Sequence, residues 1–434
     1  MAEKILIINI HSSTNAGDAA LLQVTLQQLA AVFPACQVTL SMNDPGSHTG
    51  EQRVVASISS WVHPRQADGS LKWNLLRLAW LLPATLLPVW GRGLPGRMRY
   101  LLTPSALISI LDPYLGADLV ISEPGGFLYS SGNGISLLLA LYSIALAVMA
   151  RKPVYLFPQT IGPLRNRWEK WLLRWVLQRA RIVMVREPVS LKLVQGYGVR
   201  NPNLRLVPDV AFTFPAAPQP EAEAWLRAQG IGPHDARPRL GMTLLNWGVQ
   251  NPRFTRQGEY EQACAAAARW FVEHTGGVVF LFPQVWERSL HGDDRIPAQR
   301  VADQLSDLGE AVRMIQEPLP GATLKAVYGL MDIFIGTRMH SNIFALSQGV
   351  PVIAIGYLHK TRGIAEMAGI SEWVIDIGEV DAQNLTSRLA ALWEDRLSVG
   401  KHIQRTIPGL VGQAGAAGEM VQVDYAKLNR GSRG

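Results

Sequence analysis

The chain has 434 residues, of which 48% are apolar and 17% are charged, and its formal net charge is +7. This length favours two domains of roughly 200 residues each over a single core. The two cysteines, Cys36 and Cys264, lie far apart in apolar segments, which excludes a disulfide framework and a cysteine metal site. No uncharged apolar run reaches the roughly 18 residues of a membrane-spanning helix.

One strongly basic segment indicates an anionic partner. Residues 151–200 contain eleven Lys or Arg and only two acids, Glu169 and Glu187. A basic face of this kind suits a phosphorylated metabolite, a nucleic acid or an anionic lipid. No nucleic-acid-binding motif accompanies the charge, so we expect no nucleic-acid partner.

The first residues predict the start of a doubly wound α/β domain. An apolar run at 4–10 is typical of a buried strand, and a small polar loop leads from it into a helix-periodic segment at 21–33. This beginning predicts a strand and not a secretion signal, so we expect a cytoplasmic protein. Asn15, Gly17 and Asp18 lie where the loop meets the helix. They fit either a helix cap with its turn or a loop that faces an interdomain cleft.

Residues 71–102 form a Leu- and Trp-rich insert that contains Pro83 and Pro88 and carries only basic charges. The prolines predict that its helix is broken. One interpretation is a helical hairpin packed on its own domain. The other is a basic, Trp-bearing segment that lies peripherally at the inner face of a membrane.

The N-terminal half then repeats strand, loop and helix. Strands are predicted at 117–122, 153–157, 182–185 and 205–207. The loops after the first three strands hold the candidate ligand-binding residues Glu123, Gly125 and Gly126, then Gln159, then Arg186. Glycines at such a strand end let a ligand approach the main chain closely.

The alternation of strands and helices predicts an α/β protein with two Rossmann-like domains facing across a cleft, the GT-B-like arrangement. We expect the first domain at 1–212, a linker rich in Pro, Ala and Glu at 213–238, and the second domain at 239–411. A flexible or back-packing tail follows at 412–434. We assign the acceptor to the first domain and the donor to the second.

The most informative stretch is residues 332–363. It predicts a strand at 332–335, a helix at 341–348 that ends at Gly349-Val350-Pro351, and a strand at 352–355. Four cationic or titratable side chains follow the two strands: Arg338, His340, His359 and Lys360. Cations beside a helix N-terminus at the carboxyl ends of parallel strands form an anion site.

Taken in order along the chain, these motifs resemble the polysaccharide pyruvyl transferase family. The motifs that carry the resemblance are Asn15-Ala16-Gly17-Asp18-Ala19-Ala20, Gly125-Gly126, Gln159-Thr160-Ile161-Gly162-Pro163, Arg186 with Ser190, Pro208-Asp209, Arg338-Met339-His340, and Gly349-Val350-Pro351 followed by Tyr357 and Lys360. The resemblance implies a GT-B-like fold, phosphoenolpyruvate as donor and a sugar diol as acceptor. It also implies a product with a cyclic pyruvate ketal on an envelope or exported polysaccharide, or on its lipid-linked precursor.

Ketal formation begins with protonation of the methylene of phosphoenolpyruvate, for which histidine is suited near neutral pH. We therefore take His340 as the general acid and expect His359 not to be essential. Arg338, Lys360 and Arg186 are the predicted binders of donor phosphate or carboxylate, and Asp18 or Glu123 is the predicted base for the acceptor hydroxyl. The chemistry requires no metal or further cofactor, and the carboxylates form no recognisable ligand cluster.

Two other functions remain open from the sequence. A GT-B glycosyltransferase would use the same cationic edge for the diphosphate of a nucleotide sugar. A non-catalytic member of an envelope-assembly complex would keep the fold with a decayed site. The presence of Arg338, His340 and Lys360 argues against the second.

Overall fold

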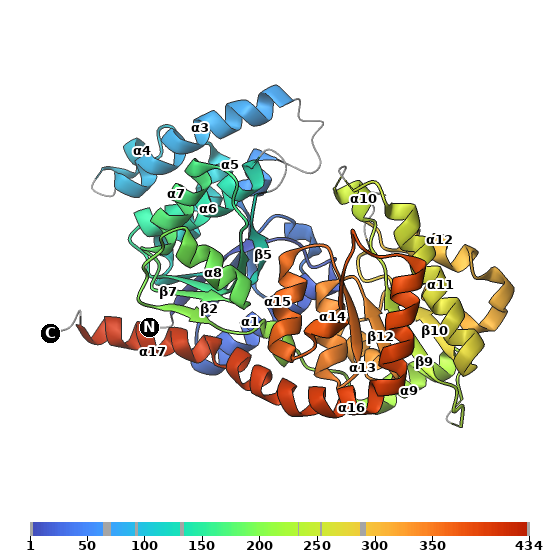
Figure 1. Ribbon diagram of the computed structural model, residues 1–434. Helices are drawn as coiled ribbons and strands as arrows, with labels where there is room; N and C mark the ends of the chain where they lie inside the picture. The colour runs from blue at the N-terminus through green and yellow to red at the C-terminus, as the bar shows by residue number, and fades with distance from the viewer. Residues whose placement is uncertain are drawn as a thin grey trace. The chain divides into compact units, whose positions relative to one another are not determined.

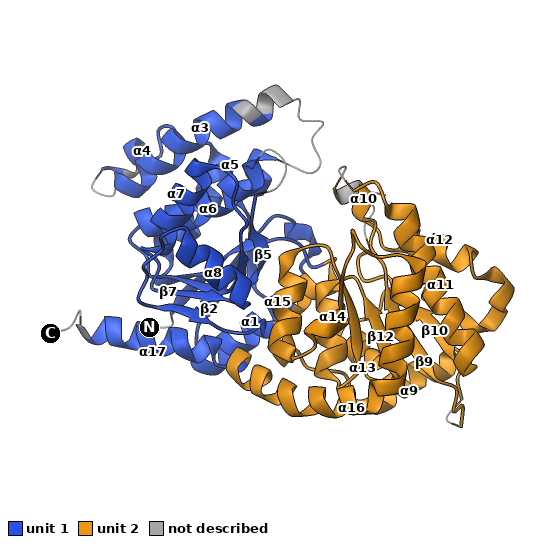
Figure 2. Cartoon of the chain, in the orientation of Figure 1, with its two compact units in different colours: residues 1–13, 21–210, 415–434 blue, residues 14–20, 211–414 orange. Residues whose placement is uncertain are grey.

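A computed structural model describes residues 3–63, 71–91, 94–130, 134–232, 234–251, 254–286 and 292–431. The chain forms two compact units (Figure 2). Unit 1 comprises residues 1–13, 21–210 and 415–434, and unit 2 comprises residues 14–20 and 211–414. Residues 213–238, expected as a linker, include helix α9 (Gln219–Ala228) and group with unit 2.

Unit 1 is built on an eight-stranded parallel sheet. Its main path has the order β3-β2-β1-β4-β6-β7-β8, and β5 pairs with β6 off this path. The strands are β1 (Lys4–Ile10), β2 (Gln37–Met42), β3 (Arg53–Ala56), β4 (Leu119–Ser122), β5 (Gly125–Leu128), β6 (Val154–Ile161), β7 (Ile182–Val185) and β8 (Leu204–Leu206). The loops predicted at Gly125-Gly126 and Gln159 are therefore strand residues.

Helices connect these parallel strands (Figure 1). They are α1 (Ala16–Val32), α2 (Ile58–Val62), α3 (Leu71–Trp90), α4 (Gly96–Arg99), α5 (Ser105–Gly116), α6 (Ile135–Met149), α7 (Arg167–Leu177) and α8 (Pro188–Gly196), and α17 (Ala417–Gly431) joins them from the end of the chain. Helix α8 begins three residues before its predicted start because Pro188 occupies its first turn, where no N–H is needed.

Unit 2 contains a six-stranded parallel sheet in the order β11-β10-β9-β12-β13-β14. Its strands are β9 (Arg239–Thr243), β10 (Val278–Leu281), β11 (Val312–Met314), β12 (Ile333–Gly336), β13 (Val352–Gly356) and β14 (Val374–Asp376). Its remaining helices are α10 (Trp247–Gln250), α11 (Gln257–Thr275), α12 (Arg295–Asp303), α13 (Gly321–Tyr328), α14 (Met339–Ser347), α15 (His359–Ala368) and α16 (Ala382–Gly415). Numbered within the unit, this order is 3-2-1-4-5-6, the doubly wound Rossmann topology.

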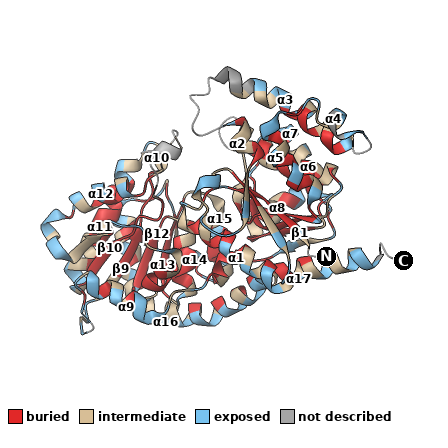
Figure 3. Ribbon diagram, turned by 180° about the vertical axis from the view of Figure 1, so that it is seen from behind, coloured by how far each residue is buried: buried red, intermediate tan, exposed pale blue. Residues whose placement is uncertain are grey.

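The cores lie in and around the two sheets. Every residue of β4, β6, β7, β10, β12 and β13 is buried, so both faces of these strands are covered. Figure 3 shows the same concentration of buried residues in the strands of both units. Parallel sheets covered on both faces produce the continuous apolar runs that identified these strands in the sequence. The prediction of two parallel-sheet α/β domains is confirmed.

Helix α3 continues through Pro83 and Pro88, so the predicted break at the prolines is wrong. A proline lacks the N–H that would bond to the carbonyl four residues earlier. For Pro88 that carbonyl belongs to Ala84, and the Thr103 hydroxyl donates to it at 2.7 Å. The Arg99 side chain donates to the Pro88 carbonyl at 2.8 Å. Among the described residues, no helix is long and apolar enough to cross a bilayer.

The end of the chain packs back onto unit 1. Tyr155 Oη donates to Asp424 Oδ2 at 2.9 Å, and Arg181 donates to both carboxylate oxygens of Asp424 at 2.9 and 2.8 Å. The Gly418 N–H donates to the side chain of Gln28 at 3.0 Å. These contacts fix α17 beside the sheet, which corresponds to the back-packing form of the predicted tail.

Asp424→Asn should loosen α17. The substitution removes the charge that Arg181 holds bidentately, and because Arg181 is 39% exposed the expected loss is only ~1 kcal/mol. Hydrogen exchange of the α17 amides should quicken about 5-fold. Glu419→Gln, which neutralises an exposed acid on the same helix, is the matched control. Equal exchange in the two variants would show that Asp424 does not hold the helix.

Candidate active site

The strand order of unit 2 places its ligand-binding edge between β9 and β12. The order reverses there, and ligands of such sheets bind beyond the carboxyl ends of the strands at the reversal. Helix α14 starts three residues after the end of β12, and α15 starts three residues after the end of β13. The two helices contact each other. Two neighbouring helix N-termini at this edge favour an anionic ligand.

Helix α14 begins two residues before its predicted start, and helix α15 was not predicted, so both change the position of the site residues. Arg338 is the N-cap of α14, and His340 lies in the first turn of that helix and not in a loop before it. Lys360 is the second residue of α15. All three side chains are partly exposed, so a ligand at this edge can reach them.

Tyr357 links the two predicted donor-binding cations. Burial raises the pKa of Tyr357, but the charges of Lys360 and Arg338 outweigh burial and lower it below its ordinary value. Lys360 Nζ lies 5.5 Å from the centre of the Tyr357 ring, and Trp247 packs on the same ring at 4.6 Å. Arg338 and Lys360 therefore both lie near the Tyr357 phenol, and their charges make the electrostatic potential around it positive.

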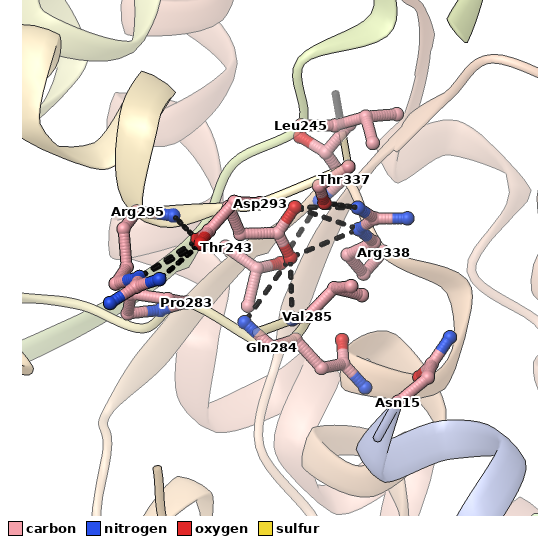
Figure 4. Close-up of polar contacts among 12 residues, drawn as sticks. Asn15, Thr243, Leu245, Pro283, Gln284, Val285, Asp293, Arg295, Thr337 and Arg338 are labelled. Atoms are coloured by element: carbon pink, nitrogen blue, oxygen red, sulfur yellow. Dashed lines mark hydrogen bonds and ion pairs between the residues drawn. The ribbon is translucent and has the colours of Figure 1, made fainter. Parts of the chain in front are cut away.

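Arg338 is held by a buried carboxylate that the sequence analysis missed. Its Nη2 donates to Asp294 Oδ1 at 2.5 Å, and its Nε donates to Oδ2 at 3.1 Å (Figure 4). Asp294 also accepts the backbone N–H groups of Gln284 at 3.2 Å and Val285 at 2.9 Å. Burial raises the pKa of Asp294, and Arg338 with these two amides offsets part of that effect.

This pairing limits what Arg338 can offer a ligand. Nε and Nη2 are engaged, while Nη1 donates no hydrogen bond to the described residues. A donor anion would therefore meet one oriented edge of the guanidinium, with its position fixed by Asp294. Arg338 and Asp294 both lie in residues 211–414, so their salt bridge is a contact within unit 2. It is not an ion pair between domains.

The N-terminal loop meets His340 directly. A Cβ atom built on Gly17 would lie 2.0 Å from His340 Nδ1 and 2.6 Å from Cγ. The Gly17 N–H donates to Asn15 Oδ1 at 2.9 Å, and Asn15 forms a β-bridge with Val285. Residues 14–20 accordingly group with unit 2. Only glycine leaves room at position 17 for the imidazole, which explains the motif in physical terms.

Gly17→Ala should displace the His340 ring and lower turnover at least ~10²-fold, the effect of about 1 Å of misplacement at a reacting group. Steady-state kinetics would measure the loss. Gly258→Ala is the matched control, because Gly258 is also the second residue of a helix and nothing lies within 4 Å of its added Cβ. Full activity of Gly17→Ala would contradict the close packing.

Gln284 is a second polar residue that sequence reasoning missed. It is 3% exposed, and its Oε1 atom is buried and has no hydrogen-bond partner among the described residues. Figure 4 shows its side chain extending toward Asn15. A buried, unsatisfied carbonyl oxygen is costly, so its presence beside the site favours a ligand or water donor there. Its position just after β10 was the available signal.

Asp18 also groups with unit 2, one residue after the glycine that contacts His340. It is half-buried, and its carboxylate makes no hydrogen bond to the described residues. Gly17 and Asp18 are the second and third residues of α1, so the cap interpretation fits Asn15, which precedes the helix and accepts the Gly17 N–H. Asn15 caps the local turn, whereas Gly17 and Asp18 lie on the side of the predicted acid.

In unit 1, the residues predicted from the strand ends gather around β4, β5 and β6. Glu123 follows β4 and is 4% exposed. Gln159 donates from Nε2 to Ser122 Oγ at 3.3 Å and to the Glu123 carbonyl. Gly125 pairs with Gln159 between β5 and β6, and Gly126 follows it in β5. These four predicted residues therefore lie close together, and their role in binding stays a prediction.

Two residues of this cluster were not anticipated. Asn9 adopts a left-handed conformation with φ of 66° inside β1, and its Nδ2 donates to Ser122 Oγ at 3.2 Å. Such a conformation is uncommon outside glycine, and asparagine tolerates it best. Phe127 packs on the exposed His11 ring with 5.4 Å between centroids. His11 is thus the exposed member of this group, whereas Asn9, Glu123 and Gln159 are buried.

Arg186 does not join either cluster as a ligand-binding residue. It is 1% exposed, and its Nη1 donates to Asp209 at 2.6 Å while its Nε donates to the Thr160 hydroxyl at 2.7 Å. Such burial leaves no route for a donor phosphate. Arg186 belongs to the interior of unit 1, where it ties the end of β6 to the segment after β8, and this corrects its predicted role in donor binding.

Solved structures of sugar-nucleotide enzymes share the fold. UDP-GlcNAc 2-epimerase from Neisseria meningitidis, bound to UDP-GlcNAc, aligns with 98% of this chain and 100% of its own at 12% identity and a TM-score of 0.58. Sucrose-phosphate synthase from Thermosynechococcus elongatus aligns with 99% of this chain and 100% of its own at 16% identity and a TM-score of 0.58. These likenesses support the predicted GT-B-like fold.

Sequence comparison identifies the family. The amylovoran biosynthesis protein AmsJ of Erwinia amylovora is 22% identical over 422 residues, which are 93% of this chain and 95% of AmsJ. Residues 15–359 match the family described as polysaccharide pyruvyl transferase. The match includes the loop at Gly17 and the acid candidate His340, which meet in the structure. The chain therefore belongs to the polysaccharide pyruvyl transferase family.

Proposed function

We propose that this protein transfers the pyruvyl group of phosphoenolpyruvate to a sugar diol and forms a cyclic ketal. The acceptor is a sugar of an envelope or exported polysaccharide, or of its lipid-linked precursor. The observation that carries the proposal is the packing of His340 against Gly17 at an edge that also holds Arg338 and Lys360. The family and the relative in amylovoran biosynthesis support the same general role.

The donor carries a phosphate and a carboxylate, and unit 2 offers a matching set of groups. Lys360 supplies a mobile ammonium, Arg338 supplies one oriented edge of its guanidinium, and the N-termini of α14 and α15 add backbone N–H groups. We assign donor binding to Arg338 and Lys360, with Asn15 and Gln284 at its margin.

His340 is the proposed general acid. It gives its proton to the methylene carbon of phosphoenolpyruvate, and the neighbouring carbon becomes oxocarbenium-like. One sugar hydroxyl adds to that carbon and loses its proton to a base. The carbon–oxygen bond to phosphate then breaks, inorganic phosphate leaves, and the second hydroxyl closes the ring. The balance is one phosphoenolpyruvate and one diol giving one ketal and one phosphate.

Asp18 is the favoured base for the acceptor hydroxyl. It shares unit 2 with His340 and its carboxylate is not bonded to the described residues. Glu123 is the alternative, placed in unit 1 beside Gly125, Gly126 and Gln159, and we propose that acceptor sugar meets this cluster at Gly126, its partly exposed member. Asp18→Asn and Glu123→Gln would distinguish them, because only loss of the base slows turnover at saturating acceptor.

The direct test is incubation of the purified protein with phosphoenolpyruvate and lipid-linked saccharide precursors. Mass spectrometry should detect one added pyruvyl group, and a phosphate assay should detect one phosphate per product. A thermal-shift series with phosphoenolpyruvate and with nucleotides distinguishes this function from the alternative one. Stabilisation by UDP, GDP or CMP compounds but not by phosphoenolpyruvate would favour a nucleotide-sugar glycosyltransferase instead.

A further inference from the structure

Exposed apolar side chains are concentrated on one part of unit 1. Of the thirteen large hydrophobic residues that are exposed in the described chain, ten lie in two segments, 76–102 and 168–171. The most exposed are Leu101 at 77%, Trp90 at 67% and Trp171 at 65%. A soluble monomer rarely exposes apolar groups together in this number, so the patch indicates an interaction surface.

The two segments form one surface. Helices α3 and α7 both pack on α6. In Figure 1 and Figure 3, which view the protein from opposite sides, α7 lies next to the α3–α4 segment. We call the exposed residues of 76–102 together with those of 165–174 the Trp/Arg face.

Helix α7 has one buried side and one side that exposes two tryptophans. Its inward side carries Glu169, Leu173 and Val176, while Trp168 and Trp171 point outward with exposed fractions of 42% and 65%. Tryptophans on the outer side of a basic amphipathic helix are typical of segments that lie in the headgroup region of a bilayer.

The charge on the Trp/Arg face is uniformly positive. Residues 76–102 contain four arginines and no acid, and residues 165–174 contain four more Lys or Arg with one acid, Glu169. Glu169 is 1% exposed and accepts the N–H of Asn166 at 2.8 Å, so it adds no negative charge to the surface. The face therefore complements an anionic partner.

The exposure of the α3 segment is fixed by polar contacts. Trp80 Nε1 donates to the Leu102 carbonyl at 3.0 Å, and Arg99 donates to the Pro88 carbonyl at 2.8 Å. Arg77 anchors the other side by donating to the Trp61 carbonyl at 3.0 Å. The segment is thus tied down with its apolar side chains outward.

We propose that the Trp/Arg face docks unit 1 on the surface of an anionic phospholipid bilayer. Tryptophan and leucine side chains enter the headgroup region, and the arginines pair with lipid phosphates. The proposal requires only binding at the bilayer surface and no membrane-spanning helix, and none is found among the described residues. The inference goes beyond the proposed function, and it would place the enzyme where a lipid-linked acceptor lies.

Co-sedimentation with vesicles tests the proposal. The wild-type protein should bind vesicles of phosphatidylcholine with about one third phosphatidylglycerol and release as salt increases, and should bind pure phosphatidylcholine at least ~10-fold more weakly. Trp168→Ser combined with Trp171→Ser, and separately Arg167→Glu combined with Arg174→Glu, should each lower binding at least ~10-fold. The replaced side chains are exposed, so circular dichroism should stay unchanged.

Leu397→Ser is the control, because it removes an exposed leucine (71%) on α16 outside the face and should leave binding unchanged. Equal vesicle binding by wild type and both double variants would overturn the proposal. So would a mass from light scattering that falls from dimer to monomer in the tryptophan variant, since the face would then join two copies of the chain. Neither readout requires enzymatic activity, so failure here is separable from failure of the proposed function.

Discussion

His340→Gln should lower the rate of phosphate release from phosphoenolpyruvate by ~10²–10⁴-fold, the range expected when a general acid is lost. Glutamine keeps much of the size and the hydrogen-bonding capacity of the side chain but has no proton to give at neutral pH. The ring site itself is defined by Gly17, so glutamine should fit it without moving α1. Phosphate release in the presence of acceptor is the measurement.

His340→Gln should still bind the donor, so this variant separates a loss of the chemical step from a loss of donor affinity. Arg338 and Lys360 remain in place in His340→Gln, so phosphoenolpyruvate should still raise the melting temperature. Lys360→Met should show the reverse pattern, with a weakened thermal shift and a raised KM. If His340→Gln loses the thermal shift as well, the histidine binds the donor and is not simply the acid.

His359→Gln is the matched control for the acid assignment. His359 belongs to the same edge and is the first residue of α15, but none of the described glycines packs against its ring as Gly17 packs against His340. Turnover within a few-fold of wild type is expected. Equal losses in the His340 and His359 variants would mean that general positive charge, and not one proton donor, governs the rate.

The sequence was sufficient for the parts of the fold that depend on local pattern. Strands such as β12 and β13 are buried on both faces and read as short apolar runs, and the turns after them carry the residues that a parallel sheet directs to one edge. This is why the sequence alone identifies Arg338, His340 and Lys360 as candidates. Their positions within helices α14 and α15 do not follow from it, because helix starts depend on capping by the preceding residues.

Long-range pairing was the part that no local pattern encodes. The close approach of Gly17 to His340, and the burial of Asp294 beside Arg338, depend on how distant segments pack. Arg186 shows the converse. The position of Arg186 after a strand predicted a ligand-binding residue, but its ion pair with the Asp209 carboxylate holds the side chain in the protein interior. A cation at a strand end is therefore informative only once its partner is known.

Helix α3 illustrates the same limit for backbone structure. Two prolines predict a break, yet the helix persists because the Thr103 hydroxyl, from a segment beyond the end of the helix, satisfies the carbonyl of Ala84 that Pro88 leaves open. A tertiary contact thus overrides a local propensity. The continuous helix also carries four exposed residues of the Trp/Arg face, Leu76, Trp80, Leu82 and Trp90.

Asp294→Ala should lower the free energy of unfolding by ~3–5 kcal/mol, the cost of leaving a buried charge without its partner. Asp294 is fully buried, and the Arg338 guanidinium, which is only 13% exposed, keeps its charge at neutral pH when Asp294 is removed. The variant also leaves the N–H groups of Gln284 and Val285 without their acceptor. Urea denaturation measures the loss.

The neighbouring acid provides the control. Asp293 pairs with Arg295, whose side chain is 46% exposed, so Asp293→Ala releases its partner into water and should cost no more than ~1 kcal/mol. Adding Arg338→Met to Asp294→Ala should restore part of the stability, because the unpaired charge is then gone. The same change removes the edge of the guanidinium that faces the ligand. Donor binding should therefore stay weak in the double variant even as folding recovers. Additive destabilisation by the two changes would mean that Asp294 supports the fold independently of Arg338, and the oriented guanidinium would then need another cause.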